Sequence, residues 1–401
     1  MTSSTLAATG TWKPGKDLPA PGGWYGQHDG AVVLTTPDGK SQVLVVGGVD
    51  GKGVAQATGA VYDVAGDAWT TADPHVPRRL HATTVLADGK VLVTGGVSGS
   101  PFSPGLTAAE IFNPADKTWK VVAGMKQGRW GHSAVLLPNK QVLVAGGATN
   151  RSGDSIRALA SAELYDPDKN TWTDAKPMTD PRTGHTAIVL KDGKVLVCGG
   201  TVPVSGTGDV ALGFCELYTP GTTPGNDSWS ATGSLLRPRT GHQAVKLSET
   251  SVLVVGGGVP GAPGDGTFDP YARLTVEQFD LTAGAGTWQD VTPAEPVPRG
   301  RGLHRAVPLG TGKVLVAGGT AGPRDDVGYP SALILDASGA EKTWTTAAGM
   351  ATGRWAFAAV ALPGTKVLVT GGVARSGLAA TDPDADELAK TTEIFDAGSG
   401  S

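Results

Sequence analysis

The sequence predicts an all-β fold in which one four-stranded unit occurs seven times around a ring. Three observations support this prediction. An apolar run that ends in two glycines recurs about every fifty residues, a period typical of closed or stacked repeat proteins. A short strand signal with a tryptophan follows every run except the last. The signal that the last unit lacks stands at the other end of the chain, at Thr11 and Trp12.

The third unit shows the four strands most clearly. An apolar stretch at 133–137 is strand one, a turn at 138–140 reverses the chain, and the run at 142–147 is strand two. Strand three at 162–165 alternates apolar and polar residues, and strand four at 171–173 carries a tryptophan. The apolar run of strand two is typical of a strand buried on both faces, and its final glycines allow positive φ angles where the chain leaves the sheet.

The other units repeat these signals. The glycine pairs are Gly47-Gly48, Gly95-Gly96, Gly146-Gly147, Gly199-Gly200, Gly256-Gly257, Gly318-Gly319 and Gly371-Gly372. A motif of the type Arg-x-Gly-His opens strand one at 25–28, 78–81, 129–132, 182–185, 239–242, 301–304 and 354–357. The tryptophans of strand four are Trp69, Trp119, Trp172, Trp229, Trp288 and Trp344.

These repeats predict a single domain, 1–401, with seven blades of four antiparallel strands. The blades are expected at about 24–73, 78–122, 129–174, 182–231, 239–290, 301–346 and 354–396. The last blade lacks strand four, so an N-terminal outermost strand at about 9–14 is expected to pair with it and close the ring. Closure removes the open sheet edges that favour aggregation.

The opening motif, the glycine pair, the Tyr or Phe of strand three and the Trp of strand four together resemble the kelch motif. Over 9–396 the chain resembles a bacterial kelch-repeat β-propeller, similar to the propeller domain of galactose oxidase. The resemblance implies a seven-bladed propeller whose 4–1 and 2–3 loops share one face around an axial pocket. It says little about function, because one fold serves many functions.

Composition argues against several classes of function. The net charge is −4, which argues against binding to nucleic acid through phosphate charge. No run of like charge points to a membrane surface, no apolar run reaches membrane-spanning length, and the first residues lack the pattern of a signal peptide. We therefore expect a cytoplasmic monomer.

The only two cysteines, Cys198 and Cys215, end strand two and begin strand three of one unit. They could be neighbours in the sheet. Two buried free thiols are the simpler interpretation in a reducing compartment.

One arginine per blade is the first candidate for ligand binding. The resemblance places these arginines on the face of the axial pocket, where guanidinium groups suit carboxylate or phosphate. The alternative is that each arginine packs between blades and bonds a neighbouring loop. The six residues are Arg78, Arg129, Arg182, Arg239, Arg301 and Arg354.

Six histidines also share one repeat position, which raises the possibility of a metal ion in the axial channel. The favoured interpretation is structural hydrogen bonding between blades, because the repeat itself explains the residue. No cofactor is predicted, and the Tyr-His pairing expected of a copper site like that of galactose oxidase is missing. The histidines are His28, His81, His132, His185, His242 and His304.

Residues that break the repeat on the pocket face are the remaining candidates, because the fold does not require them. Tyr25 replaces an arginine, and Asp29 follows a histidine, so Asp29 is a candidate base unless it bonds a backbone amide. Candidate catalytic groups are Asp29, His75, Tyr25 and Tyr271. Besides the arginine ring, candidate substrate-binding groups are Arg305, Trp130, Trp355, Phe357 and Tyr329. Tyr271 and Tyr329 stand in 2–3 loops that could equally be surface decoration.

Two functions remain open. The first is a small-molecule site in the axial pocket for an anionic, partly apolar ligand, with isomerase, lyase or cyclase chemistry through an acid or base. The second is a protein-interaction scaffold that uses the face of the 4–1 and 2–3 loops. A deep cavity walled by Trp130 or Trp355 would favour the first, and a shallow open face would favour the second.

Overall fold

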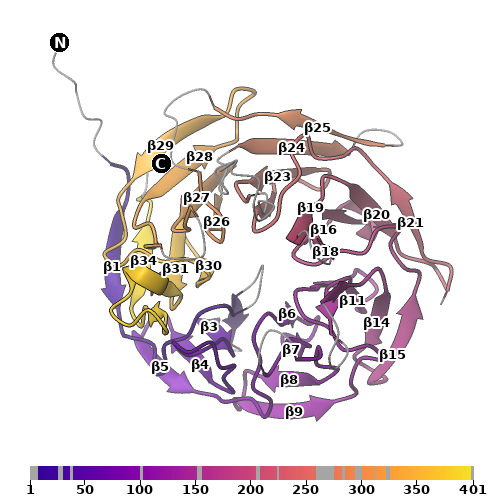
Figure 1. The fold of residues 1–401 in the computed structure, drawn as a ribbon, viewed down its shortest axis with the longest axis horizontal. Helices are drawn as coiled ribbons and strands as arrows, with labels where there is room; N and C mark the ends of the chain where they lie inside the picture. The colour runs from indigo at the N-terminus through magenta and orange to yellow at the C-terminus, as the bar shows by residue number, and fades with distance from the viewer. Residues whose placement is uncertain are drawn as a thin grey trace.

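The computed structural model is a ring of seven antiparallel four-stranded sheets (Figure 1). It describes residues 8–25, 30–36, 39–99, 103–150, 156–204, 208–223, 225–258, 275–281, 285–293, 300–310, 312–321 and 326–398. In these ranges the only helical segments are two short 3-10 turns, Lys191–Gly193 and Gly377–Ala379, so none of their helices could span a membrane. The predicted seven-bladed, all-β propeller is confirmed.

In each of the first four blades the strands are arranged in chain order, from the innermost strand at the axis to the outermost. Blade one has β2 (Ala31–Thr35), β3 (Ser41–Val46), β4 (Gly59–Asp63) and β5 (Ala68–Thr71). Blade two has β6 (Ala82–Val85), β7 (Val91–Thr94), β8 (Ala109–Asn113) and β9 (Thr118–Val122). Blade three has β10 (Ser133–Leu136), β11 (Val142–Ala145), β14 (Ala162–Asp166) and β15 (Thr171–Ala175). Blade four has β16 (Thr186–Val189), β17 (Val195–Cys198), β20 (Cys215–Thr219) and β21 (Ser228–Ala231).

The remaining blades follow the same order, except that the last takes its outer strand from the N-terminus. Blade five has β22 (Gln243–Lys246), β23 (Ser251–Val255), β24 (Val276–Leu281) and β25 (Gly286–Asp290). Blade six has β26 (Arg305–Gly310), β27 (Lys313–Ala317), β28 (Ala332–Asp336) and β29 (Thr343–Ala347). Blade seven has β30 (Ala358–Leu362), β31 (Lys366–Thr370), β34 (Thr392–Asp396) and β1 (Thr11–Gly15).

Three 2–3 loops form small hairpins of their own. These are β12 (Ala148–Thr149) with β13 (Arg157–Ala158), β18 (Thr201–Val204) with β19 (Gly208–Ala211), and β32 (Val373–Arg375) with β33 (Glu387–Leu388).

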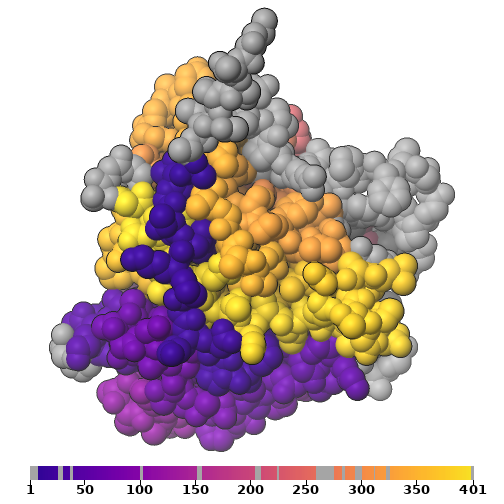
Figure 2. All heavy atoms as spheres, turned by 90° about the vertical axis from the view of Figure 1, so that its left-hand side faces the viewer, coloured from indigo at the N-terminus to yellow at the C-terminus, as the bar shows by residue number. Residues whose placement is uncertain are grey.

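The predicted closing strand is confirmed. β1 pairs antiparallel with β34, with Thr11 opposite Asp396 and Trp12 opposite Phe395. The two aromatic rings lie 5.1 Å apart, and the Trp12 indole donates a 2.6 Å hydrogen bond to the carbonyl of Ala348 in the preceding blade. In Figure 2 the indigo β1 lies against the yellow and orange end of the chain.

The core lies between neighbouring blades. Side chains of β11 are fully buried, and Val142 and Val144 pack with Leu92 of blade two and Tyr165 of blade three. Trp172 stacks on Tyr165 at 4.8 Å and donates to the carbonyl of Ala123 in blade two at 2.6 Å. The repeated tryptophan therefore joins its own blade to the preceding one.

Each glycine pair lies against the opening motif of the next blade. Gly146 and Gly147 have φ angles of 63° and 92°, which only glycine adopts readily. A Cβ on Gly146 would lie 2.7 Å from the carbonyl oxygen of Arg182, and the Gly147 amide donates to that oxygen at 2.8 Å. The glycines are therefore required both by backbone conformation and by the close approach of the next blade.

The motif that precedes strand one of blade one begins earlier in the chain than the sequence predicts. The carbonyl of Gly22 accepts the bond from Gly372 that arginine carbonyls accept in the other blades, and Trp24 has the left-handed φ of 54° found at the third motif position. Tyr25 therefore occupies the histidine position, and the motif spans 22–25. The predicted alignment, with Tyr25 in place of an arginine and His28 among the ring histidines, is wrong because residues 26–29 are an insertion before strand one. His28 and Asp29 lie outside the described residues.

Trp12→Ala tests the closing strand. The change removes the contacts with Phe395 and Ala348 and should lower the free energy of unfolding by about 2 kcal/mol, less than a fully buried tryptophan, measured by urea denaturation. It should also release β1, so proteolysis before residue 16 should accelerate and the freed edge of β34 should favour self-association.

The matched control is Trp119→Ala, at the same position of blade two. It should destabilise the protein without either of these effects. Equal proteolysis and equal self-association of the two variants would contradict the closing role of β1.

Candidate functional site

The six motif arginines are buried inside their own blades, with exposed fractions of at most 1%. Five of them form an ion pair with a glutamate from strand three of the same blade. The pairs are Arg78–Glu110 at 2.7 Å, Arg129–Glu163 at 2.8 Å, Arg182–Glu216 at 3.1 Å, Arg354–Glu393 at 2.7 Å, and Arg239–Glu277.

Blade three shows how completely these charges are satisfied. Nη1 of Arg129 donates to the carbonyls of Gly146 and Ser161 at 2.8 and 2.9 Å. The carboxylate of Glu163 accepts the backbone amides of Lys126 and Gln127 at 2.7 and 3.1 Å. A buried ion pair is tolerated when such bonds satisfy its remaining donors and acceptors. The arginines therefore fix the 4–1 loop to strand three, and none of them lines an axial cavity.

Two blades depart from this pairing. Blade one has Gly22 in place of the arginine and Ala60 in place of the glutamate, so both charges are missing together. Blade six keeps Arg301 but has Leu333 at the glutamate position. Among the described residues Arg301 has no carboxylate partner; burial lowers the pKa of its guanidinium to about 10, and Tyr329 lies beneath it at 5.7 Å.

A collar of backbone hydrogen bonds surrounds the central opening of the ring on the face of the 4–1 and 2–3 loops. It joins the third motif residues, all with positive φ, through six bonds of 2.8–3.3 Å between neighbouring blades. The collar residues are Trp24, Leu80, Gly131, Gly184, Gly241, Leu303 and Ala356. Trp24, Leu80 and Leu303 add apolar side chains to the opening.

Two cavities lie on the axis inside the collar. The upper one, about 100 Å³, is lined by His304, Arg305, Gln243 and collar residues. The lower one, about 350 Å³, is lined mostly by small apolar residues of the innermost strands and again by Gln243 and Arg305. The Arg305 guanidinium donates from Nε to the carbonyl of Phe357 at 2.7 Å. Arg305 is thus the one predicted binding residue that the described structure brings to the axis.

Three described histidines of the repeat, His132, His185 and His242, link neighbouring blades. Nε2 of His132 lies 2.9 Å from the hydroxyl of Thr94 in blade two, and Nε2 of His185 lies 2.9 Å from the hydroxyl of Ser133 in blade three. Burial lowers the pKa of His81 and of His304 to about 3, with the nearby arginine charges adding to the effect. These imidazoles are neutral at pH 7.

Among the residues that the structure describes, no three or more His, Cys, Asp or Glu side chains lie close enough together to bind a metal ion. His132, His185 and His242 lie instead against hydroxyl groups of the preceding blade, which are poor ligands for copper.

The other predicted site residues lie away from both axial cavities. His75 is 56% exposed at the side chain, and its Nδ1 lies 2.7 Å from Glu110. Tyr25 is buried, and its burial raises the pKa of the hydroxyl, with the Arg354 charge opposing the rise. Trp355 and Phe357 are fully buried in apolar clusters. Trp130 is half-buried beside β12, and Tyr329 is half-buried against Arg301. Tyr271 lies outside the described residues.

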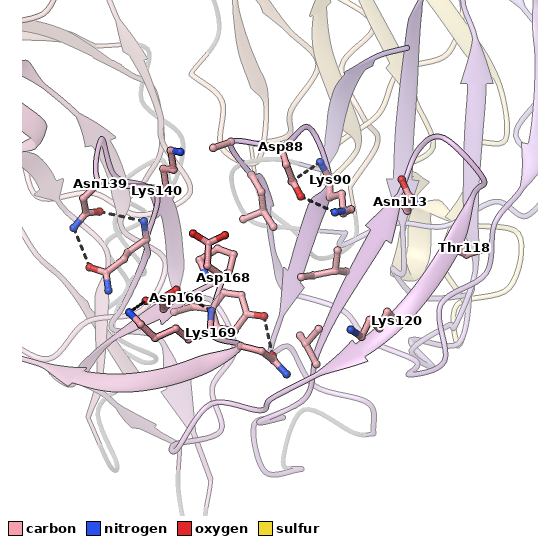
Figure 3. Close-up of a pocket in the computed structure, with 18 residues that line it drawn as sticks. Asp88, Lys90, Asn113, Thr118, Lys120, Asn139, Lys140, Asp166, Asp168 and Lys169 are labelled. Atoms are coloured by element: carbon pink, nitrogen blue, oxygen red, sulfur yellow. Dashed lines mark hydrogen bonds and ion pairs between the residues drawn. The ribbon is translucent and has the colours of Figure 1, made fainter. Parts of the chain in front are cut away.

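A groove of about 840 Å³ lies between blades two and three, on the face opposite the 4–1 and 2–3 loops, and Figure 3 shows the residues that line it. Lys90 and Lys169 on its rim form ion pairs within their own turns, with Asp88 and Asp166. The buried Tyr165 at its floor donates to Asn170 at 2.9 Å. Part of the charge on the groove is therefore paired within single turns, and the Tyr165 hydroxyl is bonded to Asn170.

Sequence analysis missed three exposed apolar residues on the face of the 4–1 and 2–3 loops, Val210, Phe214 and Leu236, which we call the apolar edge. The segments of Phe214 and Leu236 adjoin, because the Leu235 amide donates to the Gly213 carbonyl at 2.8 Å. The exposed fractions of the three residues are 50%, 58% and 55%. The Phe214 carbonyl accepts a 2.6 Å bond from Arg182, and the Leu236 amide donates a 2.6 Å bond to Glu277. The two buried ion-pair networks therefore hold the backbone of this edge in place.

A break in the repeat could have revealed this edge. At the position of Phe214, where the carbonyl accepts from the motif arginine, the other arginine-bearing blades have Ala108, Ser161, Thr275, Ser331 and Thr391. At the position of Leu236 blade three has Lys126 and blade four has Thr179.

The fold and its repeated arginine, glycine pair and tryptophan define a kelch-type β-propeller. The chain belongs to the Attractin/LZTR1 β-propeller family, whose model matches residues 40–263.

Curated relatives are similar over part of their length. Kelch-like protein 35 of Mus musculus is 29% identical over 242 residues, 60% of this chain and 38% of that protein. Alpha-scruin of Limulus polyphemus is 25% identical over 228 residues, 55% of this chain and 24% of that protein. Galactose oxidase of Gibberella zeae is 26% identical over 261 residues, 59% of this chain and 35% of that protein. This chain thus spans less than half of the length of each.

Two solved structures share the fold. A fungal alcohol oxidase of the AA5 family, in complex with copper, aligns with a TM-score of 0.70 and 18% identity over 97% of this chain and 76% of its own. YjhT aligns with a TM-score of 0.57 and 16% identity over 79% of this chain and 94% of its own. Identities this low show the fold alone.

Variants at the histidine position test the neutral imidazole. A histidine with a pKa of about 3 in the folded protein and about 6.5 in the unfolded chain makes the unfolded state bind more protons below pH 6.5, so stability is lost as pH falls. His304→Phe introduces the residue that blade seven has at this position. Between pH 6 and 4 the free energy of unfolding of this variant should fall by about 1.4 kcal/mol less per pH unit than that of the wild type. Urea denaturation at each pH measures the slope.

The reverse change, Phe357→His, is the matched control and should steepen the same slope. If neither variant changes the pH dependence, these imidazoles are not held neutral by burial.

Proposed function

We propose that this chain is a protein-interaction propeller that binds a partner protein through the face of the 4–1 and 2–3 loops, with the apolar edge at the centre of the contact. The observation that carries the proposal is the exposure of Phe214 and Leu236 on backbone that two buried ion pairs hold rigid. Exposed aromatic and aliphatic side chains on a preorganised backbone are typical of the residues that dominate the free energy of protein association.

Two features of the axis support a partner over a small ligand. The cavity directly below the collar is about 100 Å³ and the lower one about 350 Å³, so the axis offers at most the small end of the range of roughly 300–1,000 Å³ usual for drug-sized ligands. Neither Trp130 nor Trp355 lines an axial cavity, and five of the six motif arginines are paired with a glutamate of their own blade.

Replacing the apolar edge should abolish this binding. Phe214→Ser and Leu236→Lys introduce the residues that blade three carries at the same positions, Ser161 and Lys126, so folding should be preserved. Loss of two anchors at about 1.4 kcal/mol each should weaken a partner about a hundredfold. Wild-type protein and the double variant are immobilised, and the proteins that each captures from the source cell are identified and quantified. Each captured protein is then purified, and its affinity for both forms is measured.

Val121→Ser is the control, because Val121 is 58% exposed but lies on the outer strand β9. Partners retained by the control and lost by the double variant support the proposal. Captured proteins with equal affinity for all three forms would refute it.

A second candidate is an anionic small molecule bound on the axis, with isomerase, lyase or cyclase chemistry as a further step. It is favoured by His304, whose two ring nitrogens have no hydrogen-bond partner among the described residues, beside Arg305 and Gln243. Of the candidate catalytic residues, His75 and Tyr25 lie outside both cavities, and Asp29 and Tyr271 lie outside the described residues, so the described geometry supports the binding step.

Thermal shift with a panel of mono- and dicarboxylates tests this candidate. A ligand should raise the Tm of the wild type by binding the folded state, and Arg305→Gln should reduce that rise while Arg237→Gln, on the exposed loop surface, should not. A panel without any shift, or equal shifts in both variants, removes the candidate.

A further inference from the structure

The two cysteines face each other across blade four. Cys198 is the last residue of β17, Cys215 is the first of β20, and the antiparallel register places them directly opposite. Both are buried, with exposed fractions of 0% and 3%, and both are free thiols in this structure. Directly opposed residues of antiparallel strands have Cα atoms about 4.5–5.5 Å apart, inside the range of about 4.4–6.8 Å found for disulfides.

The same pair of positions in blade seven shows how close such side chains come. There the opposed residues are Thr370 and Thr392, and their hydroxyl oxygens lie 2.9 Å apart. In blade four the Cys198 sulfur lies 3.1 Å from the hydroxyl of Thr186, and the Cys215 thiol donates to the carbonyl of Gly213 at 3.5 Å. The register therefore places the two cysteines side by side on the same face of the sheet, where an S–S bond between them is geometrically accessible.

We propose that Cys198 and Cys215 are a dithiol that closes to an intrachain disulfide by exchange with a low-molecular-weight disulfide such as oxidised glutathione. The bond would clamp the base of the 199–214 loop, which contains the hairpin β18–β19 and carries Val210 and Phe214. This inference rests on the geometry of blade four alone and does not depend on the proposed binding of a partner.

The surroundings make Cys198 the attacking thiolate. A hydrogen bond from the Cys215 thiol lowers the pKa of Cys198, with a smaller contribution from the charges of Arg182 and Arg239. Burial raises the pKa of Cys215, which suits the second, resolving role.

The exchange balances in two steps. The Cys198 thiolate attacks one sulfur of the oxidised glutathione, forms a mixed disulfide and releases one glutathione thiolate. The Cys215 thiol then loses its proton, attacks Sγ of Cys198 and releases the second. The two cysteines lose two electrons and two protons, and one glutathione disulfide becomes two thiols. Because both sulfurs are buried, the first step requires a local opening of the 199–214 loop.

The test uses the whole folded protein, incubated with oxidised glutathione or with dithiothreitol and then unfolded in an alkylating agent. The expected result is complete loss of alkylation at both cysteines after oxidation, one cross-linked peptide joining 198 to 215, and a Tm raised by about a few degrees, because the cross-link restricts the unfolded chain. Dithiothreitol should reverse all three.

Two variants sharpen the test. Cys215→Ser should stop at the mixed disulfide and retain one glutathione on Cys198. The double variant C198T/C215T carries the blade-seven residues and should fold, with a Tm that oxidised glutathione does not change. The proposal is overturned if the folded wild type still alkylates at both cysteines after oxidation, or if it carries glutathione on both without a cross-link.

Discussion

One backbone hydrogen bond, made seven times, holds the ring together. The amide of the second glycine of each pair donates to the carbonyl at the arginine position of the next blade, at 2.7–3.0 Å, from Gly48 with Arg78 round to Gly372 with Gly22. The acceptor belongs to the main chain, so the contact does not depend on the side chain. Blade one therefore keeps its place in the ring although it has lost both members of the ion pair.

This constraint explains how much of the fold could be predicted. The glycine pairs, the tryptophan of strand four and the displaced strand at Trp12 are required by backbone conformation and packing, so they stand in the sequence at fixed positions. Blade one was misaligned because four residues, 26–29, are inserted between the motif and strand one, and a shift of this size leaves Tyr25 and His28 in plausible positions. The bond from Gly372 to Gly22 and the positive φ of Trp24 identify the motif.

The arginine ring could be located from the sequence but its environment could not. A repeated arginine beside a pocket suggests a ligand, whereas the structure pairs it with a glutamate such as Glu163 more than thirty residues later in the same blade. The sequence did contain a signal for this pairing. The glutamate recurs in the third strand of five blades, and it is missing from blade one, where the arginine is missing too. The position of Phe214 also breaks a pattern of small residues, but its exposure depends on tertiary structure.

The buried pairs have a second effect on the molecular surface. Arg182 and Glu277 use main-chain groups of the loops as partners, so the loop backbone is held while its side chains remain free to differ between blades. A rigid backbone with variable side chains is a suitable base for specific recognition. The same arrangement places the Cys198–Cys215 pair directly beneath the segment that carries Phe214.

The closing strand also determines how the ring responds to mechanical force. Thr11 lies opposite Asp396 in the antiparallel pair, so a force that pulls residues 8 and 398 apart acts on the same end of β1 and β34. Such a load breaks the interstrand bonds one after another, as in a zipper, and does not shear them together. The ring therefore yields first at this seam, and the other six blades remain intact until it has opened.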